Sequence, residues 1–174
     1  MALEVSDRVR SLLISSGWEP LHSAPLFPYK DLRSDDPRGD ILRNLNGLTT
    51  KTLSDVTLKF FIPPFVAPDA NGRTVETIFT RDLQEIQDIA GVALSDPIFF
   101  CNVDDRFSPY DIVIDKYGQF FGVGEMLVYL GGSARAALDT VLFNFQLARY
   151  VNSDGSLVDL QEKPVHESVQ LEQR

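Results

Sequence analysis

The sequence has very little of the chemistry that thiol, metal and triad sites require. Of its 174 residues, one is a cysteine, Cys101, and two are histidines, His22 and His166. A single cysteine forms no intramolecular disulfide and cannot supply the several thiolates of a zinc site. Neither histidine stands in a recognisable motif with a serine or cysteine nucleophile, which argues against hydrolytic catalysis. Cys101 lies in an apolar run and is expected to pack in the core.

Long apolar runs are also missing. No window approaches about 18 consecutive apolar residues, which excludes a membrane-spanning helix. The first ten residues carry Glu4, Asp7, Arg8 and Arg10, and they lack the apolar run of a signal peptide. We therefore expect a cytoplasmic protein that does not contact a membrane.

Positive charge is scarce. The chain has 16 Lys and Arg against 25 Asp and Glu, which gives a formal net charge of -9. Such a balance disfavours binding to nucleic-acid phosphates and would suit a basic partner. Because many cytosolic proteins are acidic for solubility alone, that simpler interpretation stays open.

What is present indicates one α+β domain. Hydrophobic residues make up 44% of the chain, enough for the core of one ordinary domain. From Asn152 the composition turns polar. We predict a domain over residues 1–150 and a polar C-terminal tail over residues 151–174.

Four segments show the apolar spacing of amphipathic helices. They follow Ser6 as far as Gly17, pass through Ile41, Leu42 and Leu45, run from Thr80 to Gly91, and follow Ser133 as far as Phe145. Ser6, Thr80 and Ser133 are the expected N-caps. The proline-rich, charged segment from Pro20 to Asp40 is predicted to be irregular.

In the sequence, segments with the apolar pattern of β-strands lie between these predicted helices. Apolar residues alternate from Leu53 to Ile62, and Pro97–Val103 reads as a strand buried on both faces. Ile112–Ile114, the turn residues Asp115–Gly118 and the run Gln119–Phe121 predict a hairpin. A further strand-like run covers Gly122 to Leu130.

Carboxylates gather around this hairpin, at Asp104, Asp105, Asp111 and Asp115, with Glu125 further along. Converging carboxylates could hold Mg²⁺ or Ca²⁺. The spacing is not that of an EF-hand, however, and turns favour Asp for local hydrogen bonds. We expect solvated turn residues here and no metal. A metal-dependent hydrolase using Asp104, Asp105 and Asp111 stays as an alternative.

The glycine pairs do not predict a cofactor site. Gly122 and Gly124 lack the third glycine and helix start of a dinucleotide loop, and no Lys with Ser or Thr follows Gly131 and Gly132 as in a P-loop. We expect these glycines in turns and caps, and no cofactor.

Aromatic residues flanked by acidic ones are the best candidates for a partner-binding surface. We predict that Asp35, Asp36, Asp104, Asp105, Phe107 and Tyr110 contact a partner. A ring supplies buried area in an interface while neighbouring charges set orientation. The alternative is that these rings pack down on the sheet.

The ordered motifs resemble the SUKH superfamily, and within it the third subfamily, whose members are mostly bacterial immunity proteins. The matching residues are Gly17 and Trp18; Leu45–Leu48; Gly91–Leu94 with Pro97 and Ile98; Ile114–Phe120; and Leu130 and Gly131 leading to Ser133, Ala137 and Leu138. Residues 30–40 and those after Asn152 have no counterpart in the family.

The resemblance implies a mixed or antiparallel sheet of about five to six strands wrapped by helices. It also implies a protein without enzyme activity that binds and neutralises a cognate secreted toxin. Such toxins are often nucleases or deaminases with basic clefts, which an acidic protein would fit. A SUKH-like regulatory interaction scaffold is the alternative within the same fold.

Overall fold

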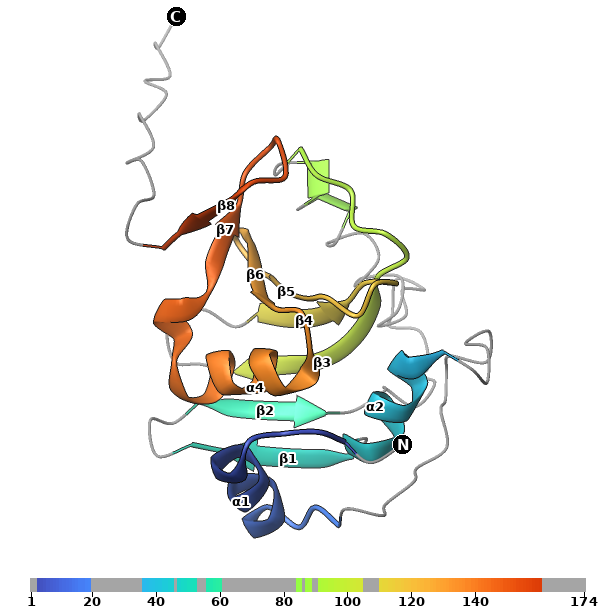
Figure 1. Cartoon of the computed structure of the whole chain (residues 1–174), viewed down its shortest axis with the longest axis vertical. Helices are drawn as coiled ribbons and strands as arrows, with labels where there is room; N and C mark the ends of the chain where they lie inside the picture. Colours follow the sequence, from blue (N-terminus) through green and yellow to red (C-terminus); the bar gives the residue numbers. More distant parts are fainter. Residues whose placement is uncertain are drawn as a thin grey trace, which may run out of the picture.

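The computed structural model describes residues 3–19, 36–45, 47–52, 56–60, 84–85, 87–88, 91–104 and 110–160. Three α-helices, one 3-10 helix and one antiparallel sheet are formed within these ranges (Figure 1). The α+β class is thereby confirmed. No helix in the described part of the chain is long and apolar enough to span a membrane.

The sheet has eight strands in the described ranges, more than the five to six that were expected. They are β1 (Leu48–Lys51), β2 (Thr57–Phe60), β3 (Ile98–Asp104), β4 (Tyr110–Ile114), β5 (Phe120–Val123), β6 (Leu127–Gly131), β7 (Arg149–Val151) and β8 (Leu157–Asp159). Their order in the sheet is their order in the chain, and every neighbouring pair is antiparallel. The strands that were not predicted are β1, β7 and β8, and at three or four residues they are too short to show the apolar alternation that predicts a strand.

The helices are α1 (Asp7–Ser15), α2 (Pro37–Leu45) and α4 (Ala134–Phe143), followed by the 3-10 helix η1 (Phe145–Leu147). In Figure 1, α4 lies across one face of the sheet and α1 lies beside β1. Side-chain bonds link these helices: Ser6 and Arg8 both donate to Asp139 Oδ1, at 2.8 and 2.7 Å. On the sheet side of α1, Ser16 donates to Thr50 Oγ1 at 2.7 Å.

Two helix starts follow the prediction and one does not. Ser6 and Ser133 are N-caps whose Oγ atoms accept from Val9 N and Ala136 N. However, α2 begins at Pro37, inside the segment that was expected to be irregular. Proline is well suited to the first helical position, where its missing N–H costs no hydrogen bond.

The helix expected from Thr80 lies mostly outside the described residues. Helical backbone is described there at 84–85 and 87–88. The predicted turn at Asn71 and Gly72 also lies outside the described residues.

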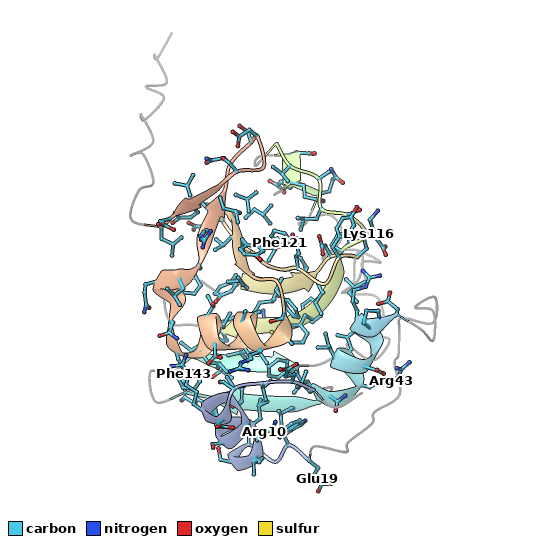
Figure 2. The ribbon with its side chains drawn as sticks, viewed as in Figure 1. Arg10, Glu19, Arg43, Lys116, Phe121 and Phe143 are labelled. Atoms are coloured by element: carbon cyan, nitrogen blue, oxygen red, sulfur yellow. The ribbon has the colours of Figure 1, made fainter. Side chains whose placement is uncertain are left out.

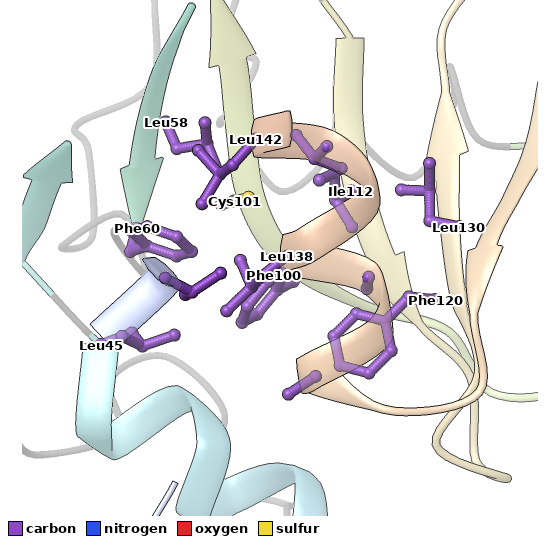
Figure 3. Packing of buried hydrophobic residues seen from close by; sticks show 14 of the residues in the cluster. Leu45, Leu58, Phe60, Phe100, Cys101, Ile112, Phe120, Leu130, Leu138 and Leu142 are labelled. Carbon is purple, nitrogen blue, oxygen red and sulfur yellow. The ribbon is translucent and has the colours of Figure 1, made fainter. Parts of the chain in front are cut away.

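The main core lies between the sheet and the helices (Figure 3). Phe60, Phe100 and Phe120 form a row of edge-to-face rings, with neighbouring centroids 5.3 and 5.2 Å apart. Edge-to-face geometry aligns the electropositive rim of one ring with the face of the next. Cys101 is fully buried in the same cluster, as expected, and burial raises the pKa of its thiol well above the usual value. A thiol held neutral in this way is a poor nucleophile.

A smaller cluster covers the opposite face of the sheet. It contains Val113, Phe121, Val123 and Leu127, and Val92 and Leu94 pack against it. Burial on both faces explains why all four residues of β5 are buried, and it confirms the expectation of a two-sided buried strand at β3.

The predicted hairpin is confirmed as β4 and β5. The expected single run from Gly122 to Leu130 is wrong in its bounds, because Gly122 and Val123 complete β5 and the chain bends before β6. β7 and β8 then form a further hairpin, whose second strand lies in the span predicted as a polar tail. Residues 161–174 lie outside the described residues.

Candidate functional site

The structure separates the predicted partner-binding residues. Asp35, Asp105 and Phe107 lie outside the described residues. Asp104 ends β3, and Tyr110 begins β4 next to it, since Val103 pairs with Tyr110. Asp36 lies near the other end of β3. It binds the side chain of Arg38, which in turn binds Asp96 just before β3.

The two groups of residues lie at opposite ends of β3. Ile98 pairs with Ile114 at one end, and Val103 pairs with Tyr110 at the other. Five residues of extended chain span roughly 17 Å. Figure 2 shows Lys116 and Phe143, one from each end, on opposite sides of the molecule. One compact site cannot therefore contain Asp36, Asp104 and Tyr110 together.

We call the first group the η1-end surface: Asp104, Tyr110, Phe143, Phe145 and Leu147. The rings of Tyr110 and Phe145 lie 6.0 Å apart, centroid to centroid. Arg8 stacks over Phe143 at 4.7 Å, and Leu147 is 63% exposed. Asp104 forms an exposed ion pair with Lys59 at 3.3 Å. Tyr110 thus packs partly onto its neighbours, as the alternative interpretation of these rings expected.

We call the second group the turn-end surface: Asp36, Asp96, Lys116 and Tyr117, with Arg38 beneath it. The backbone N–H of Lys116 donates to Ser95 O at 2.8 Å, which places the β4–β5 turn against the segment containing Asp96. Lys116 and Tyr117 both point to solvent. Asp36 was one of the six predicted contacts, and the other residues of this surface were not predicted.

The β4–β5 turn is fixed by Asp115. Its Oδ1 accepts from the backbone N–H groups of Tyr117 and Gln119, both at 2.9 Å, and the Gly118 N–H donates to Asp115 O at 3.0 Å. Asp at the start of a turn forms such bonds, and Gly118, with φ +77°, takes the left-handed position that closes a three-residue hairpin loop. Asp115 is therefore a structural turn residue, but it is buried and not solvated as was expected, because backbone N–H groups of its own turn bind its carboxylate.

Arg38 lies beneath the turn-end surface and connects Asp36 to Asp96 through hydrogen bonds. Its side chain is 6% exposed. Its Nη2 donates to Asp36 Oδ2 at 2.7 Å and to Asp96 Oδ2 at 2.9 Å, and its Nη1 donates to Asp96 O at 2.6 Å. The hydrogen bond from Arg38 lowers the pKa of Asp36, and the paired carboxylates raise the pKa of Arg38. Both shifts favour the charged forms of Asp36 and Arg38.

The carboxylates considered for a metal site do not converge. Asp111 accepts from Asn102 Nδ2 at 2.9 Å, Asp104 pairs with Lys59, and Asp115 binds backbone amides. Among the described residues, no three His, Cys, Asp or Glu side chains are grouped so that they could hold a metal ion. Asp105, the third residue of the hydrolase alternative, lies outside these residues.

Comparison of the chain with protein-family models, with curated proteins and with solved structures found no match in any of the three.

Proposed function

We propose that this protein is an immunity-type binding module that neutralises a cognate secreted toxin by direct contact and has no catalytic activity of its own. The ordered motifs described above resemble those of SUKH immunity proteins. The observation that carries the proposal is the formal net charge of -9. An acidic protein is complementary to the basic cleft of a nuclease or deaminase, and long-range attraction speeds the encounter of the two.

The described surfaces suit a binding role. Each end of β3 presents exposed rings beside charged side chains, the composition that supplies anchors in protein interfaces. The carboxylates of these surfaces accept hydrogen bonds from arginine, lysine or backbone N–H groups. Such contacts position the carboxylates, and the hydrogen bond from Arg38 lowers the pKa of Asp36.

Co-expression tests the proposal. Each toxin gene adjacent to the gene of this chain is induced in cells with and without the chain, and growth is followed. We expect the chain to restore growth against one adjacent toxin and to have no effect on a toxin from an unrelated locus, which serves as the control. Unchanged killing by every adjacent toxin, with the chain present in folded form, contradicts the proposal.

The gene neighbourhood also distinguishes an immunity protein from the alternative, a regulatory interaction scaffold. A SUKH-like scaffold uses the same fold for intracellular partners, and its gene needs no toxin beside it. An adjacent gene of regulatory function, together with no effect on killing, would favour the scaffold.

A further inference from the structure

β8 is one of the two outermost strands of the sheet in the part of the chain that the structure describes. It lies at the outer end of the sheet in Figure 1 and pairs with β7 on one side. An edge strand presents backbone N–H and C=O groups that another extended strand can bind. The geometry of this edge therefore restricts the kind of partner that can bind it.

The hydrogen bonds of the β7–β8 hairpin show which backbone groups of β8 face outward. The Asn152 N–H donates to Ser156 O at 2.9 Å, so these two residues form a hydrogen-bonded pair. Antiparallel strands alternate such pairs with pairs that exchange no bonds. Val158 therefore bonds β7, while Leu157 and Asp159 point their N–H and C=O groups away from the sheet.

These outward groups are complementary to themselves. When a second copy of β8 lies antiparallel to the first with the two Val158 residues opposite each other, Leu157 of each copy pairs with Asp159 of the other. Each of these pairs exchanges N–H···O=C bonds in both directions. The two Val158 side chains meet on one face, and β-branched residues pack well across strands.

The side chains of β8 also suit this contact. Leu157 is 39% exposed and would lose part of that exposure against the second copy. Asp159 has an ion-pair partner in its own chain, since Arg149 Nε lies 3.6 Å from its Oδ1. The contact would thus bury apolar surface without bringing an unpaired charge to the edge.

The edge formed by β1 is less suited to pairing. The Thr52 N–H donates to Val56 O at 2.9 Å, which by the same alternation turns the backbone groups of Lys51 outward. A lysine on an edge strand hinders pairing with another chain. In addition, α1 lies beside β1 in Figure 1.

The η1-end surface exposes more large apolar side chains, namely Phe143, Phe145 and Leu147. Apolar side chains of this kind fit many partners, and no contact of that surface within the described residues defines which one. The backbone groups of β8 bind an extended strand, and in the register described above they fit a second copy of the same strand.

We infer that this protein forms a symmetric homodimer in which β8 of one copy pairs antiparallel with β8 of a second copy, so that the sheet continues across both. The inference does not depend on the proposed toxin binding. β8 has three residues, and such a contact should bury less than about 1,200 Å² in total. We therefore expect a weak dimer, with a dissociation constant of about 0.1 mM.

The first test measures the dimer by sedimentation equilibrium of the full chain up to about 1 mM. Leu157→Pro removes an outward N–H and leaves the bonds to β7 intact, so it should weaken the dimer roughly tenfold or more. Thr49→Pro is the matched control, because its N–H points outward at the β1 edge, and it should change the dissociation constant less than about twofold. A wild-type chain that stays monomeric at about 1 mM, or a Leu157→Pro variant that dimerises like wild type, overturns the inference.

The second test checks the register by cross-linking. Opposite residues that exchange no hydrogen bonds have Cα atoms about 4.5 Å apart, within reach of a disulfide. We expect Val158→Cys to form a disulfide-linked dimer under mild oxidation much faster than Leu147→Cys, although Leu147 is 63% exposed. The native Cys101 is buried and should stay reduced. Faster linkage through Leu147→Cys would place the contact at the η1-end surface and overturn the inference.

The third test uses salt. Each copy carries a formal net charge of -9, so the two copies repel at long range. Raising the salt from about 0.05 M to about 0.5 M should tighten the dimer roughly threefold, whereas a contact between opposite charges would weaken. Weakening by salt therefore contradicts the pairing of two copies. Thermal melting shows whether each proline variant is folded, and if Leu157→Pro is not, the cross-linking of Val158→Cys decides.

Discussion

Arg38 shows how one side chain can hold two distant segments together. Its guanidinium is buried, and it binds the carboxylate that precedes α2 and both the carboxylate and the carbonyl of Asp96. Asp96 has φ +47°, a left-handed conformation that is uncommon outside glycine. The two bonds from Arg38 offset the cost of that backbone and fix the floor of the turn-end surface.

The first prediction concerns the buried ion pair. Asp36→Asn removes the charge that faces the buried guanidinium, so we expect the free energy of unfolding to fall by about 2 kcal/mol at neutral pH. Asp104→Asn is the matched control, since it changes an exposed ion pair with Lys59 and should cost less than about 0.5 kcal/mol. Urea unfolding followed by circular dichroism measures both. Equal losses for the two variants would contradict the role given to Arg38.

The effect of Asp36→Asn on the free energy of unfolding should depend on pH. The pKa of Asp36 is lower in the folded protein than its ordinary value of 3.8, so the folded state binds this proton less readily than the unfolded chain. The stability contributed by Asp36 is therefore present above that value and is lost as the pH falls through the folded pKa. The difference between wild type and Asp36→Asn should shrink between about pH 5 and pH 2. A constant difference in unfolding free energy across that range would contradict the hydrogen bond from Arg38 as the cause of the lowered pKa of Asp36.

Residue roles set by local sequence were predictable, and those set by distant partners were not. Ser6 and Ser133 cap helices through N–H groups three residues away, and Cys101 is buried by its own apolar run. The burial of Arg38 depends on Asp96, 58 positions away, and no sequence spacing reveals that contact.

At the scale of elements, β6 and α4 are joined by a short, closely packed connection. Gly131 ends β6 with φ +154°, and α4 begins at Ala134. A Cβ atom on Gly131 would lie 2.8 Å from Ala136 Cβ and 3.0 Å from Ala137 N. The close approach lets α4 turn back over the sheet directly after β6.

The second prediction follows from this junction. Gly131→Ala places a methyl group against the first turn of α4, so we expect a loss of about 3 kcal/mol in the free energy of unfolding. Gly132→Ala is the adjacent control, because its Cβ would meet the end of the Tyr129 side chain at 3.3 Å, and it should cost less than about 1 kcal/mol. Urea unfolding measures both. Similar stabilities of the two variants would show that the junction can relax.

Predictability of the elements followed the strength of their apolar pattern. The hairpin β4–β5, the buried strand β3 and the helices α1 and α4 have strong patterns and were found. β1, with the sequence Leu-Thr-Thr-Lys, has one large apolar residue, and the three-residue strands β7 and β8 exist through pairing with their neighbours. Tertiary pairing decided these strands, and local preference did not.

At the scale of the whole molecule, the β7–β8 hairpin carries the sheet past the predicted domain boundary at residue 150. β7 pairs with β6, and Val151 packs against the smaller apolar cluster. Leu160, directly after β8, packs against the main core. These contacts connect residues 151–160 to the rest of the fold.

The third prediction uses truncation to locate the boundary of the domain. A chain ending at Leu160 keeps every described strand, so its melting temperature should stay within about 3 °C of the full chain. A chain ending at Tyr150 loses β8 and the contacts of Val151 and Leu160, so we expect a fall of about 10 °C, or aggregation through the exposed edge. Differential scanning calorimetry compares them. If both truncated chains melt like the full chain, residues 151–160 contribute little to the stability of the domain.

The sequence did not show where the candidate surfaces lie in the fold. Composition indicated an acidic surface with aromatic residues, and Asp36 does lie on the turn-end surface. The sequence could not show that Asp36 and Asp104 face opposite ends of β3, because the distance between them depends on the packing of α2 against the loop before that strand. Tyr117 was recognised only as a turn residue, although the tip of a hairpin is where a ring is most readily exposed.

The chain-ordered sheet has a kinetic consequence. Each strand pairs with the one before it, so a growing polypeptide can add its hairpins in turn without waiting for a distant segment to be synthesised. The exception is α1, whose Ser6 and Arg8 bind Asp139 more than 130 positions later. The N-terminal helix should thus gain its native protection from hydrogen exchange late, after α4 has left the ribosome and long after α1 itself has been synthesised.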